Sequence, residues 1–229
     1  MRWVTLTLTL ALACSPLLAA DAKTKTTERL DDSASLLSEI MGTPDRSIPQ
    51  DLLEKAPCVV LVPDLKKAAF GVGGKYGRGF AVCRATGGTG WGPPAAIRIE
   101  GGSIGFQIGV SSTDVVMLVM NERGMEKLSS SKFTIGADAN AAAGPVGRDA
   151  SAQTDAYMHA EILSYSRSKG LFAGVSLNGA TLRNDLDENQ ALYGERWTSK
   201  QILGSGAKMP EAASKLIAVL NKYSMRASK

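Results

Sequence analysis

The chain has 229 residues, 44% of them hydrophobic and 21% charged, which is enough apolar material for a folded core. Its net charge of +4 is too small to argue for nucleic-acid binding, and because no nucleic-acid-binding motif accompanies it, no nucleic-acid partner is expected. A single histidine, His159, and three cysteines exclude most His/Cys metal sites and any Ser-His-Asp or Cys-His scheme without His159. We therefore expect no metal, no cofactor and no enzymatic activity.

The first twenty residues are typical of a secretory signal peptide. Arg2 is followed by an apolar run to Ala13 and then by small residues, and the run is too short for a stable membrane span. "LLAA" predicts cleavage after Ala20, whereas "ALAC" around Cys14 resembles a lipobox and leaves lipidation of Cys14 as the alternative. Both interpretations predict an exported protein, either periplasmic or secreted. If Cys14 is modified, the protein is lipid-anchored in the envelope. Residues 21–229 are predicted to form one domain.

Two cysteines, Cys58 and Cys83, lie beyond the leader. An even number of cysteines in an oxidising compartment is typical of a disulfide. The other interpretation is a pair of buried thiols on separate strands. The sequence leaves both open.

Helical patterns occur at the two ends of the chain and between them. Residues 24–41 carry apolar side chains at helical spacing and stop before Gly42 and Pro44. A second, short helix begins near Pro49 and ends before Pro57. Further helical patterns cover residues 122–130 and 184–194, and residues 209–225 predict a C-terminal helix with Pro210 in its first turn.

The middle of the chain reads as consecutive strands. "CVVLVP", from Cys58, is wholly apolar and predicts a buried strand. Residues 66–84 predict a hairpin with a glycine-rich turn, residues 95–121 predict three strands with turns at 101–102 and 112–113, and a further hairpin turns at Lys169-Gly170. Strands without helical crossovers pair antiparallel, so the fold class is α+β, with a strongly twisted, mainly antiparallel, glycine-rich β-sheet flanked by N- and C-terminal helices.

The glycine-rich stretch "KKAAFGVGGKYGRGFAVCR" (66–84) fits no phosphate-binding loop. The Walker pattern fails because Ala69 stands where its first glycine belongs and Tyr76 where Ser or Thr belongs, and no frame completes G-x-G-x-x-G. Strand-like residues follow, not the helix N-terminus that would bind phosphate. Glycines in strands indicate bending or close approach of another backbone, so we expect a curved sheet.

Several segments together resemble the SYLF family, also called the actin-binding SYLF module in its eukaryotic members. They are "IPQDLLEKAPCVVLVPDLKKAAFGVGGKYGRG", "GWGPPAAIRIEGGSIGFQIGVSSTDVVMLVMN", "AAAGPVGRDASAQTDA", "ILSYSRSKGLFAGVSLNGATLRND" and "NQALYG". The resemblance covers residues 35–200 and implies a non-enzymatic SYLF-type domain that binds membrane lipids, notably phosphoinositides in eukaryotic members. Some of those members also bind actin, but an exported chain would not meet actin, so actin is not expected as its partner.

Basic residues at predicted turns are the candidate lipid contacts. Lys66, Lys67, Lys75 and Arg78 predict a basic patch for anionic head groups, although lysines also protect sheet edges and keep hairpins soluble. Arg167 and Lys169 lie at the tip of the second predicted hairpin. The sequence therefore predicts an envelope or secreted protein that recognises anionic phospholipid head groups through Lys/Arg at hairpin tips. The alternative is an envelope structural protein that binds another protein through its sheet edge.

Overall fold

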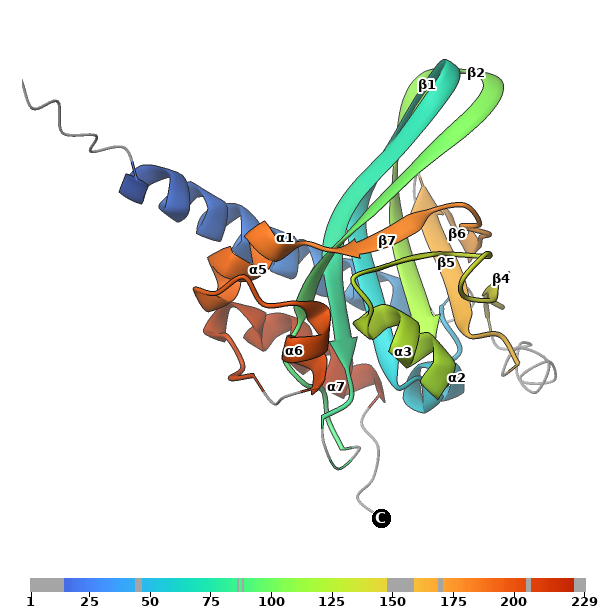
Figure 1. Cartoon of the computed structure of the whole chain (residues 1–229). Coiled ribbons are helices and arrows are strands. Elements are labelled where there is room, and N and C mark those ends of the chain that lie inside the picture. The colour runs from blue at the N-terminus through green and yellow to red at the C-terminus, as the bar shows by residue number, and fades with distance from the viewer. Residues whose placement is uncertain are drawn as a thin grey trace, which may run out of the picture.

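A single seven-stranded sheet, counted over the residues that the structure describes, organises the protein (Figure 1). The computed structural model describes residues 15–43, 47–85, 87, 89–147, 159–168, 171–204 and 207–224. The strands are β1 (Cys58–Cys83), β2 (Ala95–Val119), β3 (Lys132–Thr134), β4 (Ala141–Ala143), β5 (Ile162–Ser168), β6 (Leu171–Gly174) and β7 (Thr181–Asn184). The helices are α1 (Ser15–Met41), α2 (Gln50–Lys55), α3 (Glu122–Ser129), α5 (Leu186–Tyr193), α6 (Ser199–Gly204), η3 (Glu211–Ala213) and α7 (Ser214–Ser224). The predicted α+β class is confirmed.

Two very long strands form the centre of the sheet. β1 has 26 residues and β2 has 25, and they pair antiparallel from Cys58↔Val119 to Ala81↔Ala95. The hairpin predicted within residues 66–84 is therefore wrong, because both of its halves belong to one strand. The three strands predicted in residues 95–121 are likewise one strand, which continues through both predicted turns. The Gly101-Gly102 and Ser112-Thr113 pairs resembled turns in the sequence, but here they lie within a continuous strand.

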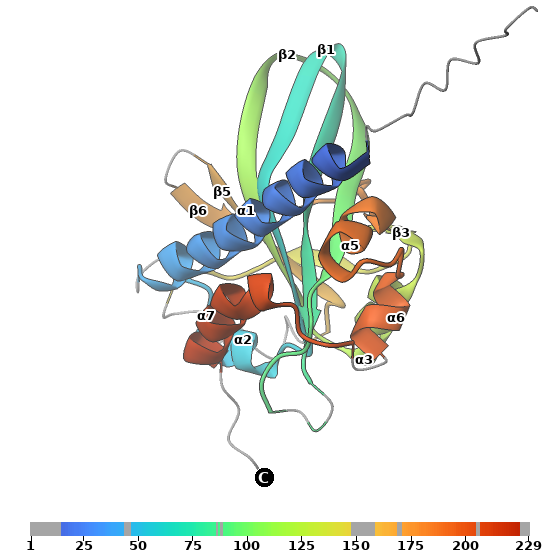
Figure 2. The ribbon, with the colours of Figure 1, turned by 90° about the vertical axis from the view of Figure 1, so that its left-hand side faces the viewer.

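The β1–β2 ribbon folds over on itself (Figures 1 and 2). Its register shifts between Phe70 and Val72, and beyond this point the ribbon returns, so the second half of β1 crosses the first. At the crossing, a Cβ on Gly79 would lie 1.9 Å from the Leu61 carbonyl oxygen, and one on Gly77 would lie 2.8 Å from Leu65 Cδ1. Glycine is required here because two backbones meet, which confirms the expectation of a strongly curved sheet.

The far end of the ribbon, which we call the arch, comprises residues 66–75 of β1 and 101–112 of β2. In the described part of the chain these segments pair only with each other, from Lys66↔Ser112 to Lys75↔Gly101. β7 joins β2 at Ile97–Glu100, and β5 joins it at Asp114–Val119. The arch therefore projects from the rest of the molecule as a two-stranded ribbon (Figures 1 and 2).

The remainder, which we call the body, has buried side chains on both faces of the sheet. On one face, α1, α2 and α7 pack over the sheet, and their Leu30, Leu52 and Leu216 are buried with Leu61 of β1. On the other face, the two halves of the folded sheet bury Val60 against a second cluster that includes α3. "CVVLVP" is apolar at successive positions because both of its faces are covered, which confirms the prediction of a buried strand.

A disulfide joins the two ends of β1. The Sγ atoms of Cys58 and Cys83 are 2.00 Å apart, so the structure carries the pairing that the sequence left open. Since the two cysteines are 25 residues apart and open and close the same strand, the bridge closes the base of the folded ribbon.

The shorter elements agree well with the sequence. α2, α3, α5 and α7 lie within the predicted helical ranges, and β5 and β6 pair around the predicted turn at 169–170, which lies outside the described residues. α5 begins at its N-cap Asp185, whose side chain accepts from Glu188 N–H, and ends at Gly194 with a φ of 82°. These capping residues lie next to the helix in the sequence, so the sequence alone was enough to predict the helix.

Candidate functional site

The inner face of the arch, on which the two halves of β1 face each other, carries two lysines. Leu65 and Gly77 meet on this face, and because side chains alternate along a strand, Lys67 and Lys75 share it. Lys75 lies across β2, where a Cβ on its pairing partner Gly101 would be 2.5 Å from Lys75 Cε. The glycine thus leaves room for the stem of the lysine on the sheet surface.

The charges of these two lysines are not neutralised by any carboxylate of the described residues. Among the residues the structure describes, neither ammonium group forms an ion pair with a carboxylate. Partial burial, and next the positive charge of Lys67, lower the pKa of the Lys75 ammonium below its ordinary value. Two cations facing each other without a counter-charge constitute a site that an anion would stabilise.

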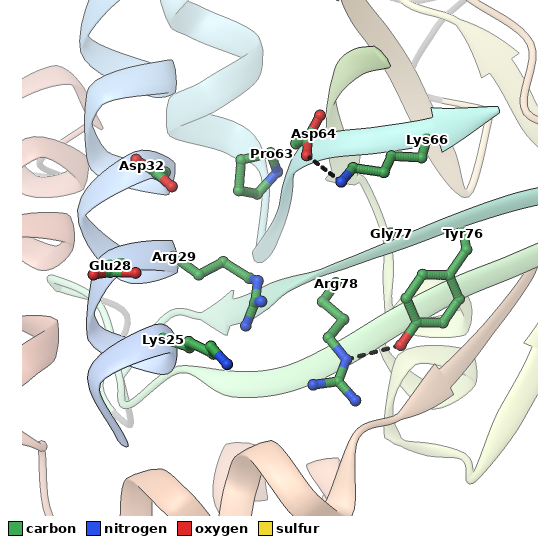
Figure 3. Close-up of a pocket in the computed structure, with 10 residues that line it drawn as sticks. All are labelled: Lys25, Glu28, Arg29, Asp32, Pro63, Asp64, Lys66, Tyr76, Gly77 and Arg78. Carbon is green, nitrogen blue, oxygen red and sulfur yellow. Dashed lines mark hydrogen bonds and ion pairs between the residues drawn. The ribbon is translucent and has the colours of Figure 1, made fainter. Parts of the chain in front are cut away.

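Lys66 and Arg78 lie on the opposite face of β1, toward α1. They line a pocket of ≈ 270 Å³ together with Lys25 and Arg29 of α1 and Tyr76 of β1 (Figure 3). Three acidic residues line the same pocket: Glu28, Asp32 and Asp64. Since the pocket is lined by four basic and three acidic side chains, it has no strong preference for an anion. The predicted basic patch is therefore divided between two faces.

Arg78 has partners within the protein. Its Nε lies 3.0 Å from Asp185 Oδ2 and donates to the Tyr76 hydroxyl at 2.8 Å (Figure 3). The side chain of Asp185 is completely buried. Arg29 of α1 pairs with the neighbouring Glu188, whose carboxyl pKa is raised by burial, although the Arg29 charge opposes this shift. These four charges connect β1, α1 and α5, and their role is structural.

Lys66 and Arg167 are also paired. Lys66 Nζ lies 3.5 Å from Asp64 Oδ2. Arg167 donates from Nη2 to Asp114 Oδ2 at 2.8 Å and also pairs with Glu39 of α1. Arg167 therefore fastens β5 to β2 and α1. Lys169 and Cys14 lie outside the described residues.

Sequence reasoning placed Lys75 and Arg78 near a hairpin turn, and that prediction is wrong, because the chain continues straight through both residues as β1. It also missed the acidic partners of the arginines. A signal existed for one of them, since Asp185 followed by Glu188 is an N-cap pattern that precedes a helix. The pairing of Arg167 with Asp114 had no local signal, because the two residues are 53 positions apart.

None of the helices among the described residues is both long enough and apolar enough to cross a membrane. Within the same residues, no three His, Cys, Asp or Glu side chains are grouped in a way that could hold a metal ion. His159 is exposed and lies with Asn140 and Glu161 in a separate pocket of ≈ 590 Å³.

The chain is thus an α+β domain in which an arch that carries two lysines projects from a helix-covered body. Its residues 100–223, more than half of the chain, match the family model described as "Ysc84: Las17-binding protein actin regulator". The chain belongs to this Ysc84 (SYLF) family, which confirms the resemblance seen in the sequence.

Individual relatives extend this comparison beyond the family match. "Protein YSC84" of Saccharomyces cerevisiae is 36% identical over 186 residues, which are 80% of this chain and 39% of the yeast protein. "LAS seventeen-binding protein 3" of the same yeast is 34% identical over 186 residues, 80% of this chain and 40% of that protein. "SH3 domain-containing YSC84-like protein 1" of Homo sapiens is 32% identical over 181 residues, 79% of this chain and 52% of the human protein. The match thus spans only about two fifths to one half of these relatives.

Proposed function

We propose that this protein binds the surface of membranes rich in anionic lipids, without catalysis, and that the arch is the element that makes contact. One observation carries the proposal: Lys67 and Lys75 face each other on the arch with no carboxylate partner among the described residues. An uncompensated ammonium near an anionic surface contributes on the order of 1 kcal/mol. The lipid phosphate would supply the counter-charge that the described residues do not provide.

The position of the lysines supports this proposal. A membrane surface is broad, so a contact site has to project beyond the body, and the arch does so (Figures 1 and 2). The arginines in the same part of the molecule are neutralised by Asp185, Asp114 and Glu39. We therefore retain Lys67 and Lys75 as head-group contacts and assign Arg78 and Arg167 to holding the fold.

Vesicle co-sedimentation tests the proposal. The protein should sediment with vesicles that contain phosphatidylglycerol at low salt and remain in solution with pure phosphatidylcholine. Lys67→Ala/Lys75→Ala should weaken the association by about tenfold, because two contributions of about 1 kcal/mol are lost and partly overlap. The matched control is Lys132→Ala/Lys200→Ala, which removes the same charge from exposed positions in β3 and α6. Equal losses in the two double variants would show that net charge alone acts, and would contradict a site on the arch.

Binding of another protein through a sheet edge is the alternative outcome. β3 and β4, which lie at two edges of the sheet, have three residues each and offer few backbone groups for strand addition. A partner strand would therefore have to add to an edge that the arch leaves unpaired. The alternative gains support if vesicles of every composition fail to bind the protein at low salt.

The membrane we propose is that of the cell envelope. The leader-like residues 1–20 support export, and Cys14 would add an acyl anchor if it is lipidated. The mass of the protein's mature N-terminus, measured from the cells that produce it, tests both points. Cleavage after Ala20 gives an unmodified N-terminal Asp21, whereas lipidation gives an acylated Cys14.

A further inference from the structure

Exposed apolar side chains occur in and next to the arch. In the described residues, the large hydrophobic side chains that are exposed are Val110 (83%), Leu171 (64%), Tyr76 (44%) and Val146 (37%). Val110 is in the arch and Tyr76 adjoins it. Leu171 follows the β5–β6 turn, and β5 runs toward the arch along β2. Exposed apolar patches mark interaction surfaces.

The sequence of the arch is unusual for a ribbon surrounded by water. No charged residue occurs between Lys67 and Lys75, or between Glu100 and Asp114. Projecting β-ribbons normally carry charged residues, which keep them soluble and prevent edge pairing. The charge-free part includes "AAFGVGG" and "GGSIGFQIGVSST", and Lys66, Lys67 and Lys75 flank it. An apolar tip between cations has the chemistry of a segment that enters an anionic bilayer.

We propose that the tip of the arch inserts into one leaflet of the bilayer, with Val110 in the apolar region and Lys67 and Lys75 at the level of the head groups. This inference rests on the proposed function and specifies how the membrane is bound. The occupant is an anionic bilayer because the apolar tip and the free cations lie together on one projecting element.

Length and backbone chemistry limit the depth of insertion. The fold at residue 71 lies four positions beyond Lys67, which corresponds to at most about 13 Å of extended strand. One leaflet contributes about 15 Å of hydrocarbon, so the tip reaches into a single leaflet and does not cross. Each strand of a two-stranded ribbon also leaves one edge of backbone N–H and C=O groups unpaired, which is costly in hydrocarbon. The tip is therefore placed at the boundary between head groups and acyl chains.

A tryptophan reporter tests the insertion directly. Val110→Trp places the fluorophore in the arch, and Val146→Trp is the matched control, because it makes the same substitution at another exposed valine, in the body beyond β4. The spectrum of the unsubstituted chain is subtracted from each. With phosphatidylglycerol vesicles, the emission of Val110→Trp should shift to shorter wavelength and be quenched by lipids brominated on the acyl chain, whereas Val146→Trp should show neither effect.

The possible results separate the two proposals. If Val110→Trp sediments with the vesicles but its emission stays at the wavelength measured without vesicles and is not quenched, the insertion is overturned and surface binding stands. If the unsubstituted chain and both variants fail to sediment with anionic vesicles, the proposed function is overturned and the insertion with it.

A charge substitution gives a second, independent readout. Val110→Asp should weaken vesicle association by about tenfold, whereas Val146→Asp should leave it unchanged, and both should remain folded by circular dichroism because each side chain is already exposed. Unchanged binding by Val110→Asp would overturn the proposal. It would also be overturned if the unsubstituted chain dimerised in the absence of lipid and Val110→Asp abolished the dimer, because the apolar tip would then bind a second copy of the chain.

Discussion

Gly79, in the body, and Gly74, in the arch, lie on the same strand but in opposite surroundings. A Cβ on Gly79 would overlap the Leu61 carbonyl, whereas a Cβ on Gly74 would have a single neighbour within 4 Å, the Gly101 oxygen at 4.0 Å. A Cβ on Gly109, also in the arch, would meet no atom of another part of the chain within 4 Å, although the φ of 153° favours glycine there. Glycine at position 79 is therefore a requirement of packing between two backbones, whereas glycine at position 74 is under no such requirement and leaves this part of the ribbon surface uncovered.

Charges differ between the two regions in the same way. In the body, Arg84 donates to the carbonyl oxygens of Leu53, Glu54 and Ser224, and its guanidinium lies 3.9 Å from the ring centroid of Trp91. In the arch, Lys67 and Lys75 have no such partners among the described residues. The comparison teaches that cations inside a fold and cations available to a ligand are distinguished by their partners and not by their positions in the sequence.

The largest expected effect tests the difference between the two kinds of glycine. Gly79→Ala should lower the free energy of unfolding by about 3 kcal/mol or more, because the crossing backbones of β1 have to separate. Gly74→Ala, the same change on the same strand, should alter it by less than about 0.5 kcal/mol. Urea-induced unfolding followed by circular dichroism measures both. Similar destabilisation by the two variants would contradict the assignment of Gly79 to a backbone crossing.

A smaller effect tests the difference between the two kinds of cation. Arg84→Met should lower the free energy of unfolding by about 2 kcal/mol, because the last carbonyls of α2 and α7 lose a charged donor. Arg196→Met is the control. It breaks the exposed Arg196–Asp187 pair, which is 2.6 Å long, and should cost less than about 0.5 kcal/mol.

Vesicle association adds a further check on Arg84. The Arg84→Met variant, measured under conditions where it is folded, should bind anionic vesicles like the unsubstituted chain, because the arch is unchanged. A loss of binding without a loss of stability would place Arg84 in the binding site and would contradict its structural role.

Most of the helices were predictable because their signals are local, although α6 was not predicted and α1 begins at Ser15, before the predicted start at residue 24. Gly42 and Pro44 follow the last residue of α1, Pro49 precedes α2, and Asp185 caps α5. The buried strand at Cys58 was predictable from its composition, and the α+β class followed from the order of the patterns. Each of these inferences needed only residues that are neighbours in sequence.

The path of β1 was not predictable from local signals. A run of glycines has the same appearance whether it forms a turn, a bulge or a backbone crossing, and only the pairing partner distinguishes them. The pairing of β1 with β2 depends on the register between the two strands, and the sequence of one strand alone does not specify that register. The same limit applies to the site: the sequence alone could list six candidate cations, but Arg167 could not be separated from Lys75 without Asp114, which is far away in sequence.

The smallest expected effect concerns pH and the arch alone. Burial and the nearby Lys67 charge lower the pKa of Lys75, so this ammonium loses its proton below the ordinary lysine value of about 10.4. The neutral amine does not attract phosphate. Association with phosphatidylglycerol vesicles should therefore begin to fall, by up to about fivefold, as the pH rises from neutral toward this value. Co-sedimentation at a series of pH values measures the decline.

Lys75→Arg provides the control for that decline, because a guanidinium stays protonated throughout this range. Its vesicle association should persist to a higher pH than that of the unsubstituted chain, whereas Lys132→Arg should behave like the unsubstituted chain. If the two arginine variants show the same pH dependence, titration of Lys75 does not control binding. The arch would then attract lipid through its overall charge and not through a lysine pair whose protonation is set by its surroundings.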